Sequence, residues 1–363
     1  MTTTTALADL TCRDLGAAID ALRSVGFRVE RISPADNPIE ADLSGHGARF
    51  RVRRVSEGEL VPATLHLGVQ TTTEPDDTSA AASTSVSWPT NWTVVPFDAE
   101  RPLVLPPMVP ELVVSRRSDT ELGVGRAGML YRDLIPSRHG GRFIASHIHI
   151  PDGGPVPDYV HYHRIRFQLI FCARGWARLV YEDQGEPFIM RAGDAVLQPP
   201  EIRHRVLEAS DHLEVVEIGC PAEHDTLGEL GFDLPTTDID PTRDFGGQRF
   251  VWHQAEGASY EPWDHPGFEA RNTGIDTATD GLADVRVARA TGDDVPHHAL
   301  RAHDREFRFH FVLEGSTVLE LDGRNELRLE QGDSVSVPAG LAYRFRPSDG
   351  LELLDVSVGQ PST

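Results

Sequence analysis

Six positions between residues 128 and 204 have counterparts between residues 267 and 343 at a nearly constant offset. His163 and Gly175 return as His303 and Gly315, 140 positions later, and four further pairs are offset by 139. These four pairs are Gly128 and Gly267, Gly193 and Gly332, Pro199 and Pro338, and His204 and Tyr343. An offset that is constant to one residue indicates two copies of one structural unit. The 363-residue chain is therefore expected to contain two similar domains in tandem.

Short runs with the composition of β-strands fill the first of these units, from Leu122 to about Cys220. Gly, Pro and Asp turns separate the runs GRFIASHIHIP, FQLIFCARG, WARLVYEDQG, PFIMRAGDAVLQPP, HRVLEA and LEVVEIG. Many short strands at close spacing are typical of a β-sandwich or β-barrel. The predicted fold class is therefore mainly β.

Two histidines stand two residues apart in the run PDYVHYHRIRFQLIFCARG, which also has the composition of a strand. Side chains two apart in a strand leave the same face about 7 Å from each other. The imidazoles of His161 and His163 can therefore converge on one point, as ligands of a metal do.

The residues that follow extend this pattern into one that resembles the cupin superfamily. Gln168 and Gly175 follow the histidine pair, and GDAVLQPPEIRH then supplies Gly193, Pro199 and His204. The resemblance implies that His161, His163 and His204 are metal ligands, and that Gln168, which replaces a family Glu, is a fourth ligand or lies just behind the ligands. Glu201 replaces the Gly that commonly precedes the third His. With the repeat, the resemblance implies a bicupin of two tandem double-stranded β-helix (jelly-roll) barrels over roughly residues 120–360.

The second barrel has lost most of these ligand positions. Arg301 takes the place of His161, Arg308 that of Gln168 and Tyr343 that of His204, so that only His303 remains. Arginine offers no lone pair to a metal, so we expect no metal site of this kind there, although His297, His298 and His310 leave an irregular site open. The two arginines could bind a carboxylate or phosphate, or they could pair with nearby acidic side chains.

The N-terminal residues 1–70 predict a small α+β module. Residues 14–25 place Leu15, Ala18, Ile19, Leu22 and Val25 on one helical face, and Gly26 suits the position after the helix. Four strand-like runs follow: FRVERI, PIEADL, ARFRVRRV and ATLHLGV. The module resembles half of a glyoxalase or vicinal-oxygen-chelate fold. Its metal-ligand candidates are His46 and His66, and we favour a scaffolding or dimerising role.

Residues 71–120 are predicted to be a linker and a strap. TTTEPDDTSAAASTS has almost no large apolar side chain, and the following VVPFDAERPLVLPPMVPELVV is rich in proline. Proline cannot donate the hydrogen bonds of a central strand, so this segment is expected to be an extended strap or an edge strand over a barrel. The barrels are expected at 121–225 and 248–363, with a connector at 226–247.

Charge and cysteine usage exclude several classes of partner. The formal charge of 34 minus 56, or −22, argues against nucleic acid and anionic membranes. The sequence contains no Lys, which excludes a Schiff-base lysine and a phosphate-loop lysine. Cys12, Cys172 and Cys220 are widely spaced, which favours a cytoplasmic protein. We find no targeting segment or 18-residue apolar run.

Three further side chains are candidates for the wall of the pocket. His147 and His149 alternate on one face of the strand before the histidine pair, and Arg166 shares its parity with Gln168. Each is a candidate acid, base or anion clamp. The alternatives are that both histidines face outward and that Arg166 forms an ion pair.

The chemistry expected of the first barrel follows from its neutral ligand set. Imidazoles suit one divalent Fe, Mn, Ni, Zn or Cu ion, and a site without a carboxylate favours an anionic, chelating small-molecule substrate. The resemblance to ring-cleaving and diketone-cleaving cupins favours Fe(II), and with it a non-haem iron dioxygenase acting on a small organic acid, enol or phenol. The alternatives are a metal-dependent isomerase, epimerase or lyase, and a non-catalytic small-molecule-binding cupin. Cupins commonly form homodimers, which we also expect here.

Overall fold

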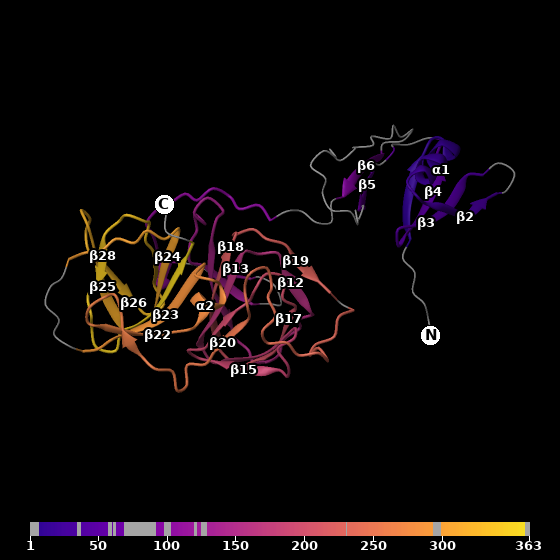
Figure 1. Ribbon diagram of the computed structural model, residues 1–363. Helices are drawn as coiled ribbons and strands as arrows, with labels where there is room; N and C mark the ends of the chain where they lie inside the picture. Colours follow the sequence, from indigo (N-terminus) through magenta and orange to yellow (C-terminus); the bar gives the residue numbers. More distant parts are fainter. Residues whose placement is uncertain are drawn as a thin grey trace. The chain divides into compact units, whose positions relative to one another are not determined.

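The structure is a computed structural model, and it separates the chain into two compact units, Met1–Pro102 and Leu103–Thr363 (Figure 1). It describes residues 7–34, 38–56, 60, 63–68, 92–97, 103–119, 122–124, 129–229, 231–292 and 299–359. Within these ranges no helix is long and apolar enough to cross a membrane. His297 and His298 lie outside the described residues, as does most of the predicted linker.

The first unit is built on a four-stranded sheet with one helix. Its elements are β1 (Ala8–Cys12), α1 (Leu15–Ser24), β2 (Arg28–Ser33), β3 (Glu40–Gly45), β4 (Ala48–Arg54), β5 (Ala63–Gly68) and β6 (Trp92–Phe97). The sheet order is β1-β4-β3-β2, in which β1 runs parallel to β4, and β5 and β6 form a separate parallel pair. The predicted helix and four strands are present. The edge strand β1 was not predicted, although Ala8, Leu10 and Cys12 alternate with polar residues in it.

The helix of this unit begins and ends at the expected signals. The Asp14 side chain accepts a hydrogen bond from the Ala17 amide at 3.0 Å, and Gly26 follows the helix with a φ of +92°. Leu15, Ala18 and Leu22 pack on the sheet. His46 is not part of a metal cluster, because its Nε2 contacts the Val25 carbonyl at 2.7 Å and its ring packs on Phe27.

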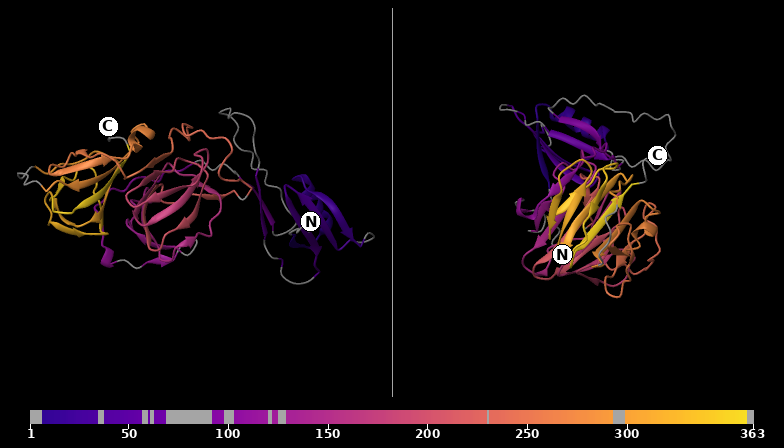
Figure 2. Two further views of the ribbon diagram at one scale, coloured as in Figure 1. Left: turned by 90° about the horizontal axis from the view of Figure 1, so that it is seen from below. Right: turned by 90° about the vertical axis from the view of Figure 1, so that its left-hand side faces the viewer.

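The second unit consists of two β-barrels with a shared core (Figure 2). The first barrel pairs a seven-stranded sheet, β20-β16-β13-β18-β10-β9-β8, with a six-stranded sheet. The six strands are β15-β14-β17-β12-β19 in order and β11, which pairs with β17. Its strands are β8 (Gly123–Val124), β9 (Leu130–Asp133), β10 (Ile144–Ile150), β11 (Gly154–Pro155), β12 (His161–His163), β13 (Phe167–Arg174), β14 (Trp176–Tyr181), β15 (Phe188–Arg191), β16 (Ala195–Leu197), β17 (His204–Ala209), β18 (Leu213–Cys220) and β19 (Thr226–Gly228).

The second barrel repeats this arrangement with sheets β21-β22-β23-β29-β24-β27-β7 and β26-β25-β28. Its elements are β20 (Val251–His253), β21 (Glu261–Pro262), β22 (Phe268–Asn272), α2 (Ile275–Ala278), β23 (Ala283–Ala290), β24 (Phe307–Glu314), β25 (Ser316–Leu321), β26 (Leu327–Glu330), β27 (Ser334–Ser336), β28 (Tyr343–Phe345) and β29 (Glu352–Val358). The mainly β, two-barrel fold is confirmed. Phe143 and Phe307 stack at 4.2 Å within the core that the barrels share.

The strand that precedes each barrel pairs with the other barrel. The Pro-rich segment supplies the edge strand β7 (Val113–Ser115), which pairs with β27 of the second barrel, Ser115 opposite Ser334. The residues that follow the predicted connector supply β20, which pairs with β16 of the first barrel, His253 opposite Ala195. A 3₁₀ turn, Arg117–Asp119, follows β7. The barrels are therefore interleaved by an exchange of equivalent strands.

A buried histidine fastens the strap to both barrels and makes stability depend on pH. His139 is 1% exposed, and its Nδ1 and Nε2 lie 3.2 Å from the Val109 carbonyl and 2.8 Å from the Ser336 hydroxyl. Burial lowers the pKa of His139, so the folded protein holds it neutral. Below pH 6.5 the unfolded chain binds a proton that the folded chain does not, so acidification reduces stability.

We therefore expect wild-type protein to lose more free energy of unfolding than His139→Asn between pH 7.5 and 5.5. The difference should approach ~1.4 kcal/mol per pH unit below 6.5. Asn tolerates the φ of +47° at this position. Urea unfolding at several pH values measures the effect, and identical pH slopes for the two proteins would contradict it.

Candidate metal centre

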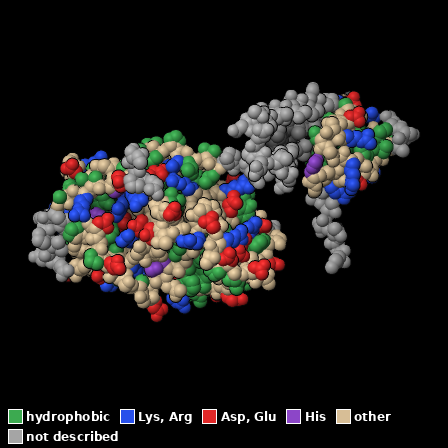
Figure 3. Space-filling model, in the orientation of Figure 1, with side chains coloured by type: hydrophobic (Ala, Val, Ile, Leu, Met, Phe, Trp, Pro, Cys, Tyr) green, Lys and Arg blue, Asp and Glu red, His purple; other side chains and the backbone are tan. Residues whose placement is uncertain are grey.

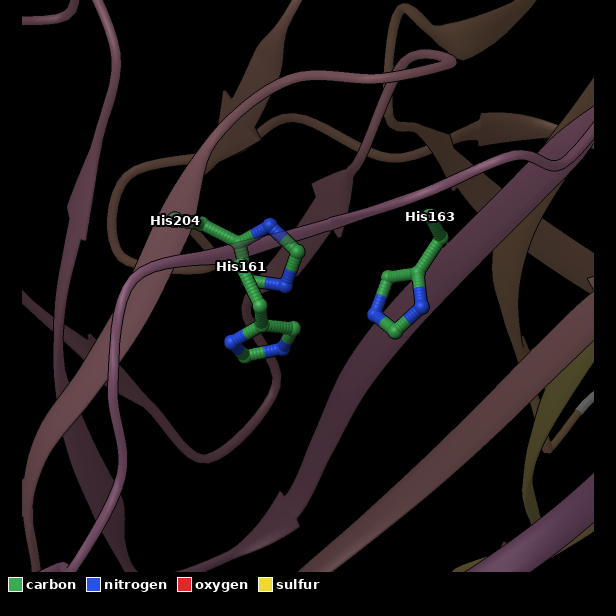
Figure 4. A group of neighbouring side chains, drawn as sticks. All are labelled: His161, His163 and His204. Carbon is green, nitrogen blue, oxygen red and sulfur yellow. The ribbon is translucent and has the colours of Figure 1, made fainter. Parts of the chain in front are cut away.

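Three histidines from two paired strands converge inside the first barrel (Figure 4). His161 and His163 extend from the same face of β12, and His204 begins β17, directly opposite His161 in the antiparallel register. One nitrogen from each ring lies within 4.8 Å of the others, and within the described part of the chain this is the one group of at least three His, Cys, Asp or Glu side chains so arranged. His161 and His204 are almost fully buried.

Hydrogen bonds set the orientation of all three rings. Nδ1 of His161 lies 2.8 Å from the Tyr159 carbonyl, and Nδ1 of His204 lies 3.0 Å from the Ile202 carbonyl. Nδ1 of His163 lies 2.9 Å from the Thr226 hydroxyl. A carbonyl accepts only from N–H, so the lone pairs of His161 and His204 reside on Nε2, and the Thr226 contact allows the same form at His163. Neutral imidazoles held in this way suit a divalent transition metal.

A buried carboxylate stands behind the first histidine. Asp158 Oδ1 lies 3.6 Å from His161 Nδ1, and Asp158 Oδ2 accepts a hydrogen bond from the Val206 amide at 3.0 Å. Carboxylates behind metal-binding histidines raise the basicity of the ring and fix its orientation. Asp158 would therefore strengthen the hold of His161 on a metal.

Gln168 lies at the same pocket, within a hydrogen-bonded chain of side chains. Its Nε2 donates to Glu217 Oε1 at 2.6 Å, and its Oε1 accepts from Gln198 Nε2 at 3.1 Å. Gln198 Nε2 also lies 3.3 Å from His204 Nε2, and Gln198 Oε1 accepts from the Tyr181 hydroxyl at 2.7 Å. Both ends of the Gln168 amide are thus occupied, and its place is beside the histidines.

The histidines line one part of a small, largely apolar pocket of about 100 Å³. Gln168, Gln198 and Glu217 are the other amide and carboxylate side chains of its lining. Apolar side chains make most of the remaining wall: Met129, Ile148, Ile150, Ile170, Leu179, Met190, Val206, Leu213 and Val215. Pockets for drug-sized ligands occupy roughly 300 Å³ or more, so this one suits a small molecule with a polar, chelating end.

The structure does not bring His147, His149 or Arg166 to this pocket. The two histidines lie in β10 as predicted, but Ile148 and Ile150 are the β10 residues that face the pocket. His147 Nε2 contacts Glu214 Oε2 at 3.0 Å, and the rings of His149 and His212 stack. Arg166 precedes β13, so strand parity does not apply to it, and it forms an ion pair with Glu306 at 3.1 Å.

The sequence analysis missed four side chains of the site: Asp158, Tyr181, Gln198 and Glu217. The ring of Tyr181 packs on Phe250, and its hydroxyl joins the hydrogen-bonded chain. One signal for Glu217 was present in the sequence. Its repeat counterpart, 138 positions later, is Asp355, which bonds Arg308, the counterpart of Gln168.

In the equivalent region of the second barrel, the polar side chains bond to one another or to nearby backbone carbonyls. Arg308 binds Asp355 through two hydrogen bonds of 3.0 and 2.8 Å, so the predicted alternative of an acidic partner applies to this arginine. His310 Nε2 lies 2.9 Å from the Tyr343 hydroxyl, and His303 Nε2 lies 2.8 Å from the Val337 carbonyl. The other arginine, Arg301, donates to the Asp264 carbonyl.

Comparison with known proteins agrees with this architecture. A family model for the cupin domain matches residues 287–357, in the second barrel. Among solved structures, the chain is similar to a salicylate 1,2-dioxygenase from Pseudaminobacter salicylatoxidans, with a TM-score of 0.52 and 17% identity over 70% of this chain and 86% of that one. It is also similar to an oxalate decarboxylase from Lactobacillus farciminis in a formate complex (TM-score 0.50, 12% identity, 68% and 86%).

The E. coli protein YlbA is similar to the same extent (TM-score 0.50, 12% identity, 73% of this chain and 96% of that one). Curated proteins give no match. Fold and site together define a two-barrel protein with one cluster of potential metal ligands among its described residues. The second barrel matches the family model for the cupin domain, and the two-barrel fold is similar to the folds of these solved structures. The two-barrel β fold expected from the sequence is confirmed.

Proposed function

We propose that this bicupin is a non-haem Fe(II) dioxygenase that acts on a small chelating organic acid, enol or phenol. The observation that carries the proposal is a three-histidine cluster, with no carboxylate among its members, lining a small apolar pocket. His161, His163 and His204 would hold one divalent metal per chain, with Gln168 beside it. Fe(II) is favoured, and Mn, Ni, Zn and Cu suit the same ligands.

A metal bound there would polarise a chelating oxygen of the substrate and, if it is iron, would supply the redox chemistry with dioxygen. The protein supplies the remaining functions. The apolar wall excludes water and accepts the hydrocarbon part of the substrate, and Asp158 and the backbone carbonyls fix the ligand rings.

Glu217 is the residue we assign to proton transfer. Among the described residues it is the one carboxylate of the pocket lining, where it faces the same space as the histidines. Its partner Gln168 is a neutral amide, whereas its counterpart Asp355 is engaged by Arg308 through two hydrogen bonds. The carboxylate of Glu217 is therefore placed to accept the proton of a phenol or enol hydroxyl of the substrate. Gln168 holds the carboxylate in place through its Nε2–H.

The substrate class is supported by the form of the pocket and by two relatives. A small cavity with one polar end fits a molecule the size of a single ring or smaller. Two of the similar structures are named for enzymes of salicylate and oxalate, both small chelating acids. This is a likeness of fold, so the panel of test substrates should span aromatic hydroxyacids, diketones and short dicarboxylates.

The test is oxygen uptake by protein loaded anaerobically with Fe(II), followed across this panel. We expect uptake with at least one substrate, and a fall in kcat of about 10²-fold or more for Glu217→Gln with metal content unchanged. Glu208→Gln, which removes a carboxylate outside the pocket lining, is the matched control. Metal-dependent turnover without oxygen uptake would replace the dioxygenase with the isomerase, epimerase or lyase alternative. Ligand binding without turnover would favour a binding protein.

Assembly and compartment complete the proposal. We infer a cytoplasmic homodimer, because the three cysteines are free and buried and cupins commonly dimerise. Light scattering on a size-exclusion column should give about twice the chain mass of 39.9 kDa. A mass of one chain would contradict the dimer.

A further inference from the structure

A second cavity, of about 530 Å³, lies between the two barrels and away from the histidine cluster. Its apolar lining includes Phe171, Phe311 and Leu313. Equivalent residues of the repeat lie on its two sides: Gly193 and Gly332, and Phe171 and Phe311. None of its lining residues belongs to the pocket of the histidines.

Two buried arginines cross between the barrels at this cavity. Arg271 of the second barrel donates to the Gly193 carbonyl at 3.0 Å, and its counterpart Arg132 of the first barrel donates to the Gly332 carbonyl at 2.5 Å. Arg271 is 4% exposed and lines the cavity, whereas Arg132, 2% exposed, lies behind Gly332.

The Nε of each guanidinium is buried without a hydrogen-bond acceptor in the part of the chain that the structure describes. Asp333 and Glu214 are acidic groups near Arg132, which lies outside the cavity lining. Arg271 lines the cavity and forms no ion pair with the described residues. Buried charges are ordinarily paired, so Arg271 points to an anion supplied from outside the chain.

The rim of the cavity adds two exposed arginines, Arg117 and Arg174. Both lie 3.8–3.9 Å from Glu214, a carboxylate that also contacts His147. Glu314 and Glu352 line the cavity too, and Glu352 accepts a hydrogen bond from the Tyr260 hydroxyl. Three lining arginines thus face three lining glutamates, and two of the glutamates have other hydrogen-bond partners. On the face of this unit that Figure 3 shows, charges of both signs are mixed.

We propose that the cavity between the barrels is a second ligand site, which takes a small organic anion with a carboxylate or phosphate group. The oxyanion accepts hydrogen bonds from the arginines, since guanidinium groups match both anions. The hydrocarbon part of the ligand packs on Phe171, Phe311 and Leu313. A ligand held by both barrels would stabilise the seam between them.

The test is isothermal titration of the full chain with benzoate, phenyl phosphate and inorganic phosphate. It is made in the His161→Ala/His204→Ala background, so that binding to a metal in the first pocket cannot contribute. We expect benzoate or phenyl phosphate to bind, and the exposed-residue variant Arg117→Gln/Arg174→Gln to weaken that binding by about tenfold or more. Arg178→Gln/Arg324→Gln, which removes two exposed arginines outside the cavity, is the control for net charge.

The probes separate the two ligand chemistries. Tighter binding of benzoate assigns a carboxylate, and tighter binding of phenyl phosphate assigns a phosphate ester. Binding of inorganic phosphate alone at millimolar concentration, unaffected by Arg117→Gln/Arg174→Gln, would overturn the proposal, as would no binding of any probe. Because the background lacks the histidine cluster, either result leaves the proposed dioxygenase function untouched.

Discussion

The His161→Ala/His204→Ala protein is expected to bind no divalent metal under conditions in which the wild-type chain retains about one ion. Two of three neutral imidazoles are removed, and the remaining His163 cannot hold a transition metal alone. Elemental analysis of protein purified without a chelating tag measures the result directly. The identity of the ion also matters: iron supports the dioxygenase, whereas zinc or nickel supports a lyase or isomerase.

His303→Ala is the matched control for this experiment. His303 occupies the position of His163 in the second barrel, but its Nε2 lies against the Val337 carbonyl. Its removal should leave metal content unchanged. Retention of metal by the double variant, or loss of metal from His303→Ala, would show that the first-barrel cluster is not the site.

The second large effect is expected on stability, from Arg308→Met in the second barrel. Asp355 is 3% exposed, and Arg308 supplies its two-point ion pair. Loss of the arginine leaves a buried carboxylate without its cation, which costs about 3–5 kcal/mol of unfolding free energy. Urea unfolding measures the loss, and metal content should not change.

The double variant Arg308→Met/Asp355→Leu separates loss of the charge pair from damage to packing. Removing both charges together should restore the free energy of unfolding to within ~2 kcal/mol of wild type. The attraction within a buried ion pair does little more than offset the cost of taking the two charges out of water. A single variant within about 1 kcal/mol of wild type would mean that Asp355 is protonated or solvated in the folded protein.

The placement of His161 and His163 on one face could be predicted from the sequence because strand periodicity is local. His204 lies on another strand, and only the resemblance to the cupin superfamily indicated that it joins them. The two barrels follow from the internal repeat, because an offset along the chain is displayed by a single sequence.

Which face of β10 lines the pocket could not be predicted in the same way. Alternation separates His147 and His149 from Ile148 and Ile150 but does not say which pair faces the pocket. Both faces of this strand are largely buried, one against the pocket and the other toward the second barrel, where His147 packs near Phe311. The usual rule that the polar face is the solvent face therefore fails here.

Glu217 and Gln198 depend on contacts between strands distant in sequence. Gln168 and Glu217 are 49 residues apart, and they meet because β13 and β18 are neighbours in the sheet. Strand order is a tertiary property, so only the analogy with Arg308 and Asp355 could have indicated this pair.

The exchange of β7 and β20 makes each barrel depend on a strand from the other half of the chain. A fragment that ends after the first barrel would carry the edge strand of its neighbour and lack its own. Neither half is then a module that can be expressed, transferred or lost independently. The second barrel can lack metal ligands and still be required, because its strand β20 completes a sheet of the first barrel.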